Sequence, residues 1–203
     1  MVERSLDALA ECYAGAEVQA MVPGVCAHVE ELAEVAAALA GRFLLLAGNG
    51  GSMAQAQHLA AEMAVGLTAR RRLPYAAHVL GGSPPTVTAA VNDLGGELIF
   101  AQEARPLLLR EDTALIAFST SGRSPNVLRV AELARECARP VVAVTGCADA
   151  PLAGPADYVI PVATWAGHPD ASAASIQVGH LVVIHLLVAL IEREVESAAR
   201  SSG

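Results

Sequence analysis

The chain is short of positive charge, of aromatic residues and of long apolar runs, and each shortage excludes a class of protein. Its 203 residues hold 13 Lys and Arg against 21 Asp and Glu, a net charge of −8. That balance argues against a nucleic-acid partner, and the basic block at 70–72 is too short to alter it. Aromatic residues make up only 3%, so the abundant alanine favours close packing of helices on a sheet.

No membrane partner is expected either. The longest apolar stretch, Leu181 to Ile191, contains His185 and falls short of the ~20 residues that cross a bilayer. It therefore predicts a buried helix.

Cysteine spacing and the first residues bear on the compartment. The four cysteines are far apart and form no Cys-x-x-Cys pair, which predicts reduced thiols instead of a zinc knuckle or a disulfide framework. The N-terminal residues lack a basic region followed by an apolar core, so they do not resemble a signal peptide. We therefore expect a cytoplasmic protein.

Strands alternate with helices along most of the chain. Apolar runs predict five strands, at 43–47, 75–80, 113–118, 140–145 and 157–162. Helices are predicted at 5–20, at 27–40, after the first strand, around 92–93, at 96–109 with a break at Pro106, at 126–137 and at 173–196. Loops are predicted at 146–154 and 163–172. The order predicts an α/β fold with a doubly wound, five-stranded parallel sheet flanked by helices. One domain is expected over 1–203, with N-terminal helices in 1–41, a core in 42–200 and a long C-terminal helix.

A glycine-rich turn, Gly48-Asn49-Gly50-Gly51-Ser52, follows the first predicted strand. Its glycines allow main-chain N–H groups to approach a ligand at the positive end of the next helix, which suits phosphate. Ser52 is expected at the N-cap of that helix. The alternative is a tight turn that binds nothing.

His58 and Glu62 are four residues apart on the same predicted helix, so both emerge on one face, about 6 Å apart along the axis. Such a pair can hold one metal ion. Zinc accepts imidazole nitrogen and carboxylate oxygen, but it needs three or four ligands. A hydrogen bond at the surface is the alternative.

A second small polar turn, 119–125, follows the third predicted strand. Ser119, Thr120, Ser121 and Ser124 place their hydroxyls beside a new helix end, which indicates a phosphate cradle without positive charge. A serine-rich capping turn is the alternative.

The last predicted helix carries Gln177, His180 and His185. Gln177 and His185 are about 12 Å apart along the axis, so they share one metal only by leaning together or by belonging to different subunits. His180 is expected in the core.

These motifs, in this order and over nearly the whole chain, resemble the phosphoheptose isomerases of the sugar isomerase (SIS) domain family. The resemblance implies conversion of D-sedoheptulose 7-phosphate to D-glycero-D-manno-heptose 7-phosphate, the first step of nucleotide-activated heptose biosynthesis. It also implies a cytoplasmic homotetramer with active sites between subunits and one zinc ion per subunit.

The resemblance further assigns residues to roles. Zinc would be held by His58, Glu62, Gln177 and His185. Substrate would be contacted by Asn49, Gly50, Gly51, Ser52, Glu62, Asn92, Asp93, Ser119, Thr120, Ser121, Ser124 and Gln177. Moving a carbonyl from C2 to C1 needs a base and an acid around an enediol, and we assign Glu62 as the base and His185 as the acid. Asp93 and Thr120 would orient hydroxyls, and zinc would organise the site.

The chain departs from the family pattern at several positions. Gly66-Leu67 stand where an arginine is usual after the glutamate, with arginines displaced to 70–72, and Ser175 and Val178 replace charged neighbours of Gln177. The loop before Gln177 is also long. Two alternatives therefore stay open: a non-catalytic SIS regulator of the replication-initiator-associating type, and an isomerase for another phosphosugar. Retention of Glu62 and His185 argues against the regulator.

Overall fold

The computed structural model describes residues 15–65 and 75–201 and contains one five-stranded parallel sheet. Its strands are β1 (Phe43–Gly48), β2 (Ala77–Val79), β3 (Thr113–Ser119), β4 (Val141–Thr145) and β5 (Tyr158–Pro161), in the order β2-β1-β3-β4-β5. The expected doubly wound sheet is thus confirmed. All five predicted strands are present, but β2 covers only 77–79 of the predicted 75–80, and the last strand ends at Pro161 because Val162 begins a helical turn.

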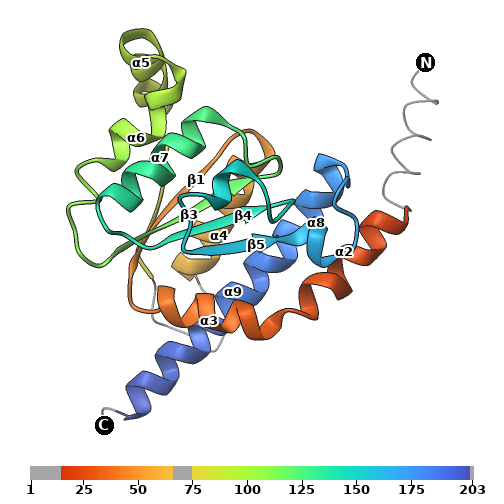
Figure 1. Cartoon of the computed structure of the whole chain (residues 1–203). Coiled ribbons are helices and arrows are strands. Elements are labelled where there is room, and N and C mark those ends of the chain that lie inside the picture. The colour runs from red at the N-terminus through yellow and green to blue at the C-terminus, as the bar shows by residue number, and fades with distance from the viewer. Residues whose placement is uncertain (1–14, 66–74, 202–203) are drawn as a thin grey trace, which may run out of the picture.

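Helices cover both faces of the sheet, which explains why its strands are almost wholly apolar. One face carries α2 (Ala16–Cys26), α3 (Val29–Leu39), α4 (Gly51–Val65) and α9 (Ala173–Ser201), and the other carries α6 (Ile99–Ala104) and α7 (Pro125–Glu136) (Figure 1). Alternate residues of β1 serve the two cores, with Leu44 and Leu46 on the first and Leu45 and Ala47 on the second.

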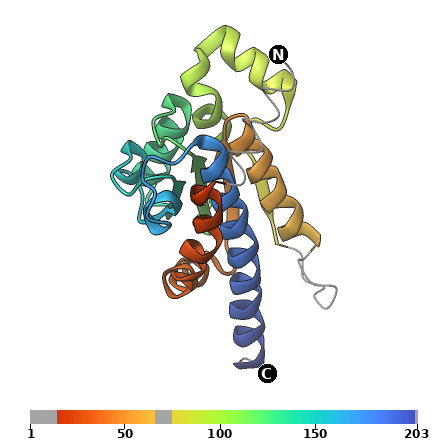
Figure 2. The same cartoon turned by 90° about the vertical axis from the view of Figure 1, so that its right-hand side faces the viewer.

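The C-terminal helix α9 is the central support of the first face. It packs against α2, α3 and α4, and its last turns run out past the rest of the fold (Figure 2). By length and composition it resembles a membrane span, with a mean hydropathy of 2.1 over a window of which 56% is buried inside the protein. Because Val183, Ile184, Leu187 and Val188 are fully buried there, its apolar character is accounted for by core packing.

The N-terminal helices differ from their predicted limits. The part of the first helix before residue 15 lies outside the described residues, and α2 does not end at Ala20 but runs on through Pro23 to Cys26. Met21 and Val25 are fully buried on either side of the proline, so packing outweighs the missing N–H of Pro23. Gly24 lets this helix pass close to Ala166, where a Cβ would come within 2.7 Å of Cα.

The remaining helices are short. They are α5 (Pro84–Leu94), η1 (Gly96–Leu98), η2 (Pro151–Ala153) and α8 (Val162–Trp165). η2 and all of α8 except Val162 lie within stretches predicted as loops, whereas α6 ends before Pro106 as expected.

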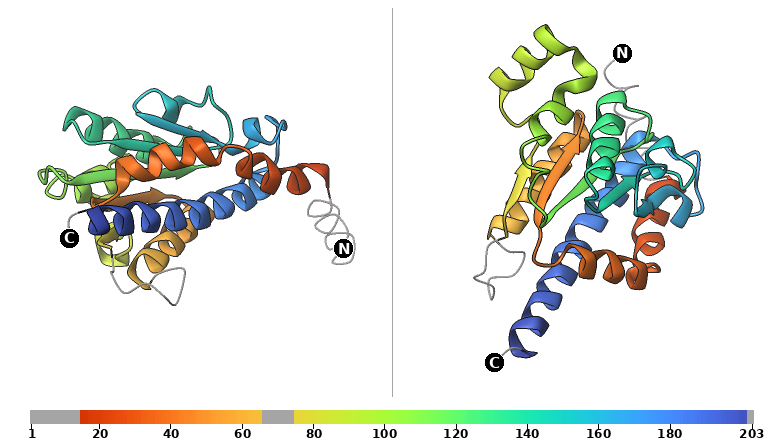
Figure 3. Two further views of the ribbon diagram at one scale, coloured as in Figure 1. Left: turned by 90° about the horizontal axis from the view of Figure 1, so that it is seen from below. Right: turned by 60° about the vertical axis from the view of Figure 1, so that its left-hand side comes forward.

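α5 stands away from the sheet between two glycine pairs, 81–82 and 95–96 (Figures 2 and 3). It packs mainly on η1 and α6. Ala90 is its buried residue.

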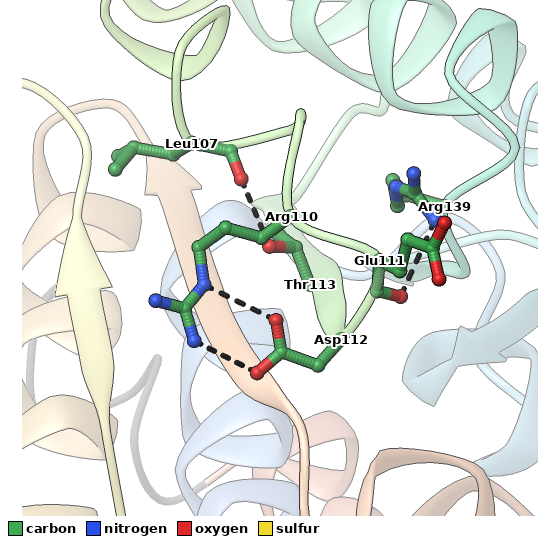
Figure 4. Close-up of polar contacts among 6 residues, drawn as sticks. All are labelled: Leu107, Arg110, Glu111, Asp112, Thr113 and Arg139. Carbon is green, nitrogen blue, oxygen red and sulfur yellow. Dashed lines mark hydrogen bonds and ion pairs between the residues drawn. The ribbon is translucent and has the colours of Figure 1, made fainter.

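Arginines tie the loops at the amino ends of the strands (Figure 4). Arg110 pairs with Asp112 through bonds of 3.1 and 2.8 Å, and the hydrogen bond from the guanidinium lowers the pKa of that carboxyl. Arg139 donates to the Leu108 carbonyl, and the Thr113 hydroxyl donates to a neighbouring carbonyl. The guanidinium groups of Arg110 and Arg139 are therefore hydrogen-bonded at the sheet edge opposite the two polar turns.

Candidate active site

The two polar turns meet at the point where the strand order reverses. β1 and β3 are neighbours, with Gly48 in register with Phe118, so the turns that follow them begin side by side at the carboxyl edge. In open parallel sheets with this order, ligands bind in the crevice at that point. The predicted placement of both turns at one edge is confirmed.

The glycine turn is shaped by close approaches. Gly50 has φ +53°, and a Cβ on Gly48 would come within 2.7 Å of the Ser52 main chain. A Cβ on Gly51 would collide with the carboxamide of Gln177. Ser52 is buried and is the second residue of α4, so the expectation that it forms the N-cap was wrong; the helix begins two residues earlier than that expectation implies.

The serine turn divides its hydroxyls between structure and solvent. The buried Ser119 hydroxyl accepts the Gly122 N–H at 3.1 Å, and the Ser121 hydroxyl accepts from Arg123. Ser124 stands at the N-cap of α7 but makes no side-chain capping bond, which leaves its hydroxyl available.

A hollow of about 460 Å³ adjoins this turn. Its lining includes Thr120, Ser121, Asp149 and Asp170, with Ile176 from the start of α9. Hydroxyl donors and carboxylates together suit a polyhydroxylated ligand.

α4 and α9 bring the histidines together. The Nε2 atoms of His58 and His185 are 3.1 Å apart, and the Glu62 carboxylate lies 3.7 Å from the same nitrogen of His58. The side chain of His58 is 40% exposed and that of Glu62 is 23% exposed, so these groups are reachable. Two turns back along α9, Gln177 lines a hollow of about 320 Å³ together with His58.

The donor set suits zinc in its chemistry. Two imidazole nitrogens bound to one tetrahedral zinc stand roughly 3.3 Å apart, given Zn–N bonds of ~2.0–2.1 Å, and His58 and His185 approach that spacing at 3.1 Å. Within 15–65 and 75–201, however, no three His, Cys, Asp or Glu side chains are grouped tightly enough to hold a metal. The two histidines are thus in place, and the Glu62 carboxylate and the Gln177 side chain lie beside them.

A buried polar chain connects the same two helices. Gln55 of α4 donates through Nε2 to the Gln177 carbonyl at 2.6 Å, and its Oε1 faces Nδ1 of His180 at 3.2 Å. Since the Gln55 oxygen can only accept, Nδ1 of His180 carries the hydrogen. Burial lowers the pKa of His180 to about 4, so the ring is neutral and belongs to the core as expected.

Comparison with known proteins assigns the family. The SIS domain profile matches residues 18–146. The chain belongs to the SIS domain family. It is similar to a phosphoheptose isomerase of Streptomyces coelicolor, at 39% identity over 166 residues that cover 80% of this chain and 68% of the relative. A phosphoheptose isomerase of Rhodospirillum rubrum is also 39% identical, over 75% of this chain and 77% of the relative.

Comparison with solved structures gives the same family. The phosphoheptose isomerase GmhA of Neisseria gonorrhoeae is similar with a TM-score of 0.71 and 30% identity, covering 94% of this chain and 98% of that one. A phosphoheptose isomerase of Francisella tularensis gives a TM-score of 0.74 at 26% identity, covering 95% and 99%.

Asn92 and Asp93 are the assigned residues that lie farthest out in the fold. They are exposed near the end of α5, where Asn92 donates to Asp93 at 2.7 Å. Because α5 packs mainly on η1 and α6, Asn92 and Asp93 lie apart from His58 and His185 within one chain.

Sequence reasoning missed two polar residues of this SIS domain. Gln55 precedes His58 by three residues on α4, so the helical period could have placed it on the same face. Asn126 pairs with Asn49 from 77 residues away, and only the neighbouring strand ends could have indicated it.

Proposed function

We propose that the protein is an aldose-ketose isomerase that converts D-sedoheptulose 7-phosphate to D-glycero-D-manno-heptose 7-phosphate, the first step towards a nucleotide-activated heptose. The observation that carries the proposal is the contact of His58 with His185 beside Glu62, in a SIS domain that is 39% identical to phosphoheptose isomerases. A base and an imidazole thus stand next to a crevice suited to phosphate.

The residues available select proton transfer as the chemistry. All 13 basic residues are arginines, so the chain has no lysine amine to form a Schiff base with the ketone. In our proposal Glu62 removes a proton from C1 and His185 gives a proton to the C2 oxygen, which forms a 1,2-enediol. Return of a proton to C2 and loss of the C1 hydroxyl proton complete the aldose.

The phosphate would be held by the glycine and serine turns, and Arg123 of the serine turn lines the hollow beside it. The free hydroxyl of Ser124, the exposed Ser121 and the half-buried Thr120 support this assignment. Neutral donors and helix ends suffice for phosphate binding.

We further propose one zinc ion per subunit, held by His58, Glu62, Gln177 and His185. Bound there, the ion would polarise substrate oxygens and stabilise the enediolate charge. A carboxylate has two oxygens, so Glu62 can ligate with one and act as base with the other. A ring nitrogen on a metal has no proton to give, so His185 would need its other nitrogen for acid catalysis.

We also propose a cytoplasmic homotetramer with active sites between subunits. Three features support an assembly that completes the site. His58 is half-exposed, Leu181 lines the same hollow and is 39% exposed, and Asn92 and Asp93 lie apart from both.

The decisive experiment follows sedoheptulose 7-phosphate by NMR with purified protein in D₂O. We expect a heptose 7-phosphate aldose and deuterium at C2 of the product, because the abstracted proton exchanges with solvent through the base. Fructose 6-phosphate and arabinose 5-phosphate serve as competing substrates. No turnover of any of them would contradict the proposal and would favour a binding role.

A further inference from the structure

The carboxamides of Asn49 and Asn126 bind each other through two reciprocal hydrogen bonds. Asn49 Nδ2 donates to Asn126 Oδ1 at 2.8 Å, and Asn126 Nδ2 donates to Asn49 Oδ1 at 2.9 Å. The residues are 77 positions apart in the sequence. The pair therefore joins segments that only the fold brings together.

The pair spans the crevice at the reversal of strand order. Asn49 belongs to the turn after β1, and Asn126 is the second residue of α7, after β3. Asn126 Oδ1 also accepts the Val127 N–H at 3.0 Å. Asn126 also lines a hollow of about 470 Å³ with Gly95, Gly96 and Glu97, which follow the end of α5 at Leu94. Asn126 thus lies between the glycine turn and the segment that follows α5.

The reciprocal pairing controls what the glycine turn presents to an anion. A carboxamide has one acceptor oxygen and two N–H donors, and an oxygen facing a phosphate would repel it. Asn126 donates to the Asn49 oxygen and accepts one Nδ2 hydrogen of Asn49. The second Nδ2 hydrogen of Asn49 is therefore left for a ligand.

We propose that Asn126 is a positioning residue for phosphosugar binding, which acts by holding the Asn49 acceptor away from the phosphate. The inference rests on the proposed function of the site. Asn126 itself need not touch the substrate.

The test compares Asn126→Ala, Asn126→Asp, Asn49→Ala and the double alanine variant. Loss of one or two neutral hydrogen bonds predicts a KM raised roughly tenfold in Asn126→Ala, with kcat changed by less than about twofold. Asn126→Asp keeps the acceptor for Asn49 and Val127 but loses the donor and adds a negative charge, so its KM should rise at least as much while the melting temperature stays near that of the wild type. Arg129→Ala, on the exposed face of the same helix, is the control and should leave KM unchanged.

The double variant decides whether Asn126 acts through Asn49. We expect its KM to equal that of Asn49→Ala, because the two side chains form one unit. Multiplied effects, or a wild-type KM in Asn126→Ala, would overturn the proposal. Titration with inorganic phosphate, followed by ³¹P NMR, gives a readout that needs no turnover. We expect Asn126→Ala to bind phosphate more weakly than the wild type, even if sedoheptulose 7-phosphate proves not to be the substrate. Unchanged phosphate binding would overturn the inference.

Discussion

His58 on α4 and His185 on α9 face each other with their Nε2 atoms 3.1 Å apart. At that distance only one hydrogen fits between the two nitrogens, so the rings either share a hydrogen bond or turn both lone pairs to a common cation. The proposed catalytic and metal roles both depend on this contact.

Replacing Glu62 by Gln tests the base. The amide keeps the size of the side chain but cannot take a proton, so kcat should fall by about 10²–10⁴-fold. Glu31→Gln is the matched control, because Glu31 also pairs with a histidine, at 2.9 Å, on the distant α3. Activity within about twofold of wild type in Glu62→Gln would contradict the role.

Replacing His58 or His185 by Ala tests the zinc proposal. Each change removes one of the proposed ligands, so bound zinc per subunit, measured by elemental analysis, should fall at least about tenfold. His28→Ala should keep its zinc, since His28 is stacked on Trp165 with ring centroids 4.4 Å apart, away from the site. Activity of zinc-stripped and zinc-reloaded wild type, assayed in parallel, reports whether His185 works with the metal bound.

Gly51→Ala tests the packing of Gln177. The new Cβ would displace the Gln177 carboxamide, so zinc affinity and kcat should both drop by roughly tenfold, with little change in melting temperature because a flexible side-chain end yields. Gly154→Ala is the control: its φ of −60° accepts alanine, and its nearest contact is a Pro151 carbonyl at 3.3 Å. Unchanged zinc content in Gly51→Ala would exclude Gln177 as a ligand.

His180 should make the stability of the protein pH-dependent. Burial lowers the pKa of His180 from 6.5 to about 4, so the unfolded chain takes up a proton first. The stability that the neutral, buried ring contributes to the folded state is fully present above pH 6.5 and is lost as the pH falls from 6.5 towards 4. Between pH 7 and pH 5 the wild type should lose about 2 kcal/mol more of its unfolding free energy than His180→Gln. Urea denaturation at both pH values measures this, and equal losses would show that the ring titrates normally.

Leu181→Asp tests the assembly. Leu181 is 39% exposed and lines the hollow beside His58, so a carboxylate there should dissociate the proposed tetramer in size-exclusion chromatography with light scattering. Leu109→Asp introduces the same charge at a residue that is 78% exposed and should leave the oligomer intact. A tetramer in both variants would place the interface elsewhere.

The sheet was predictable because strands buried on both faces are continuous apolar runs, as Phe43–Gly48 and Thr113–Ser119 illustrate. The two polar turns followed from the strands, since parallel strands bring their carboxyl ends to one edge. Helix limits were less predictable. The continuation of α2 through Pro23 depends on the burial of Met21 and Val25 against partners that lie far away in sequence.

Contacts between helices were the hardest part to foresee. Helical spacing placed His58 and Glu62 on one face, yet the approach of His185 depends on how α4 and α9 pack. The pairing of Asn49 with Asn126 was hard to foresee for another reason: two neutral amides leave no periodic or charge pattern in a sequence, and only the neighbouring strand ends hint at it. The family resemblance supplied the proposed zinc ligands, which geometry on its own could not select.

The attachment of α5 has a practical consequence. Because this helix joins the body through glycine pairs and rests mainly on η1 and α6, residues 83–94 form a cassette that can be exchanged with little disturbance of the two cores. The cassette carries Asn92 and Asp93, two of the proposed substrate contacts, so grafting it from isomerases with other sugar preferences offers a way to re-engineer the substrate range of this scaffold.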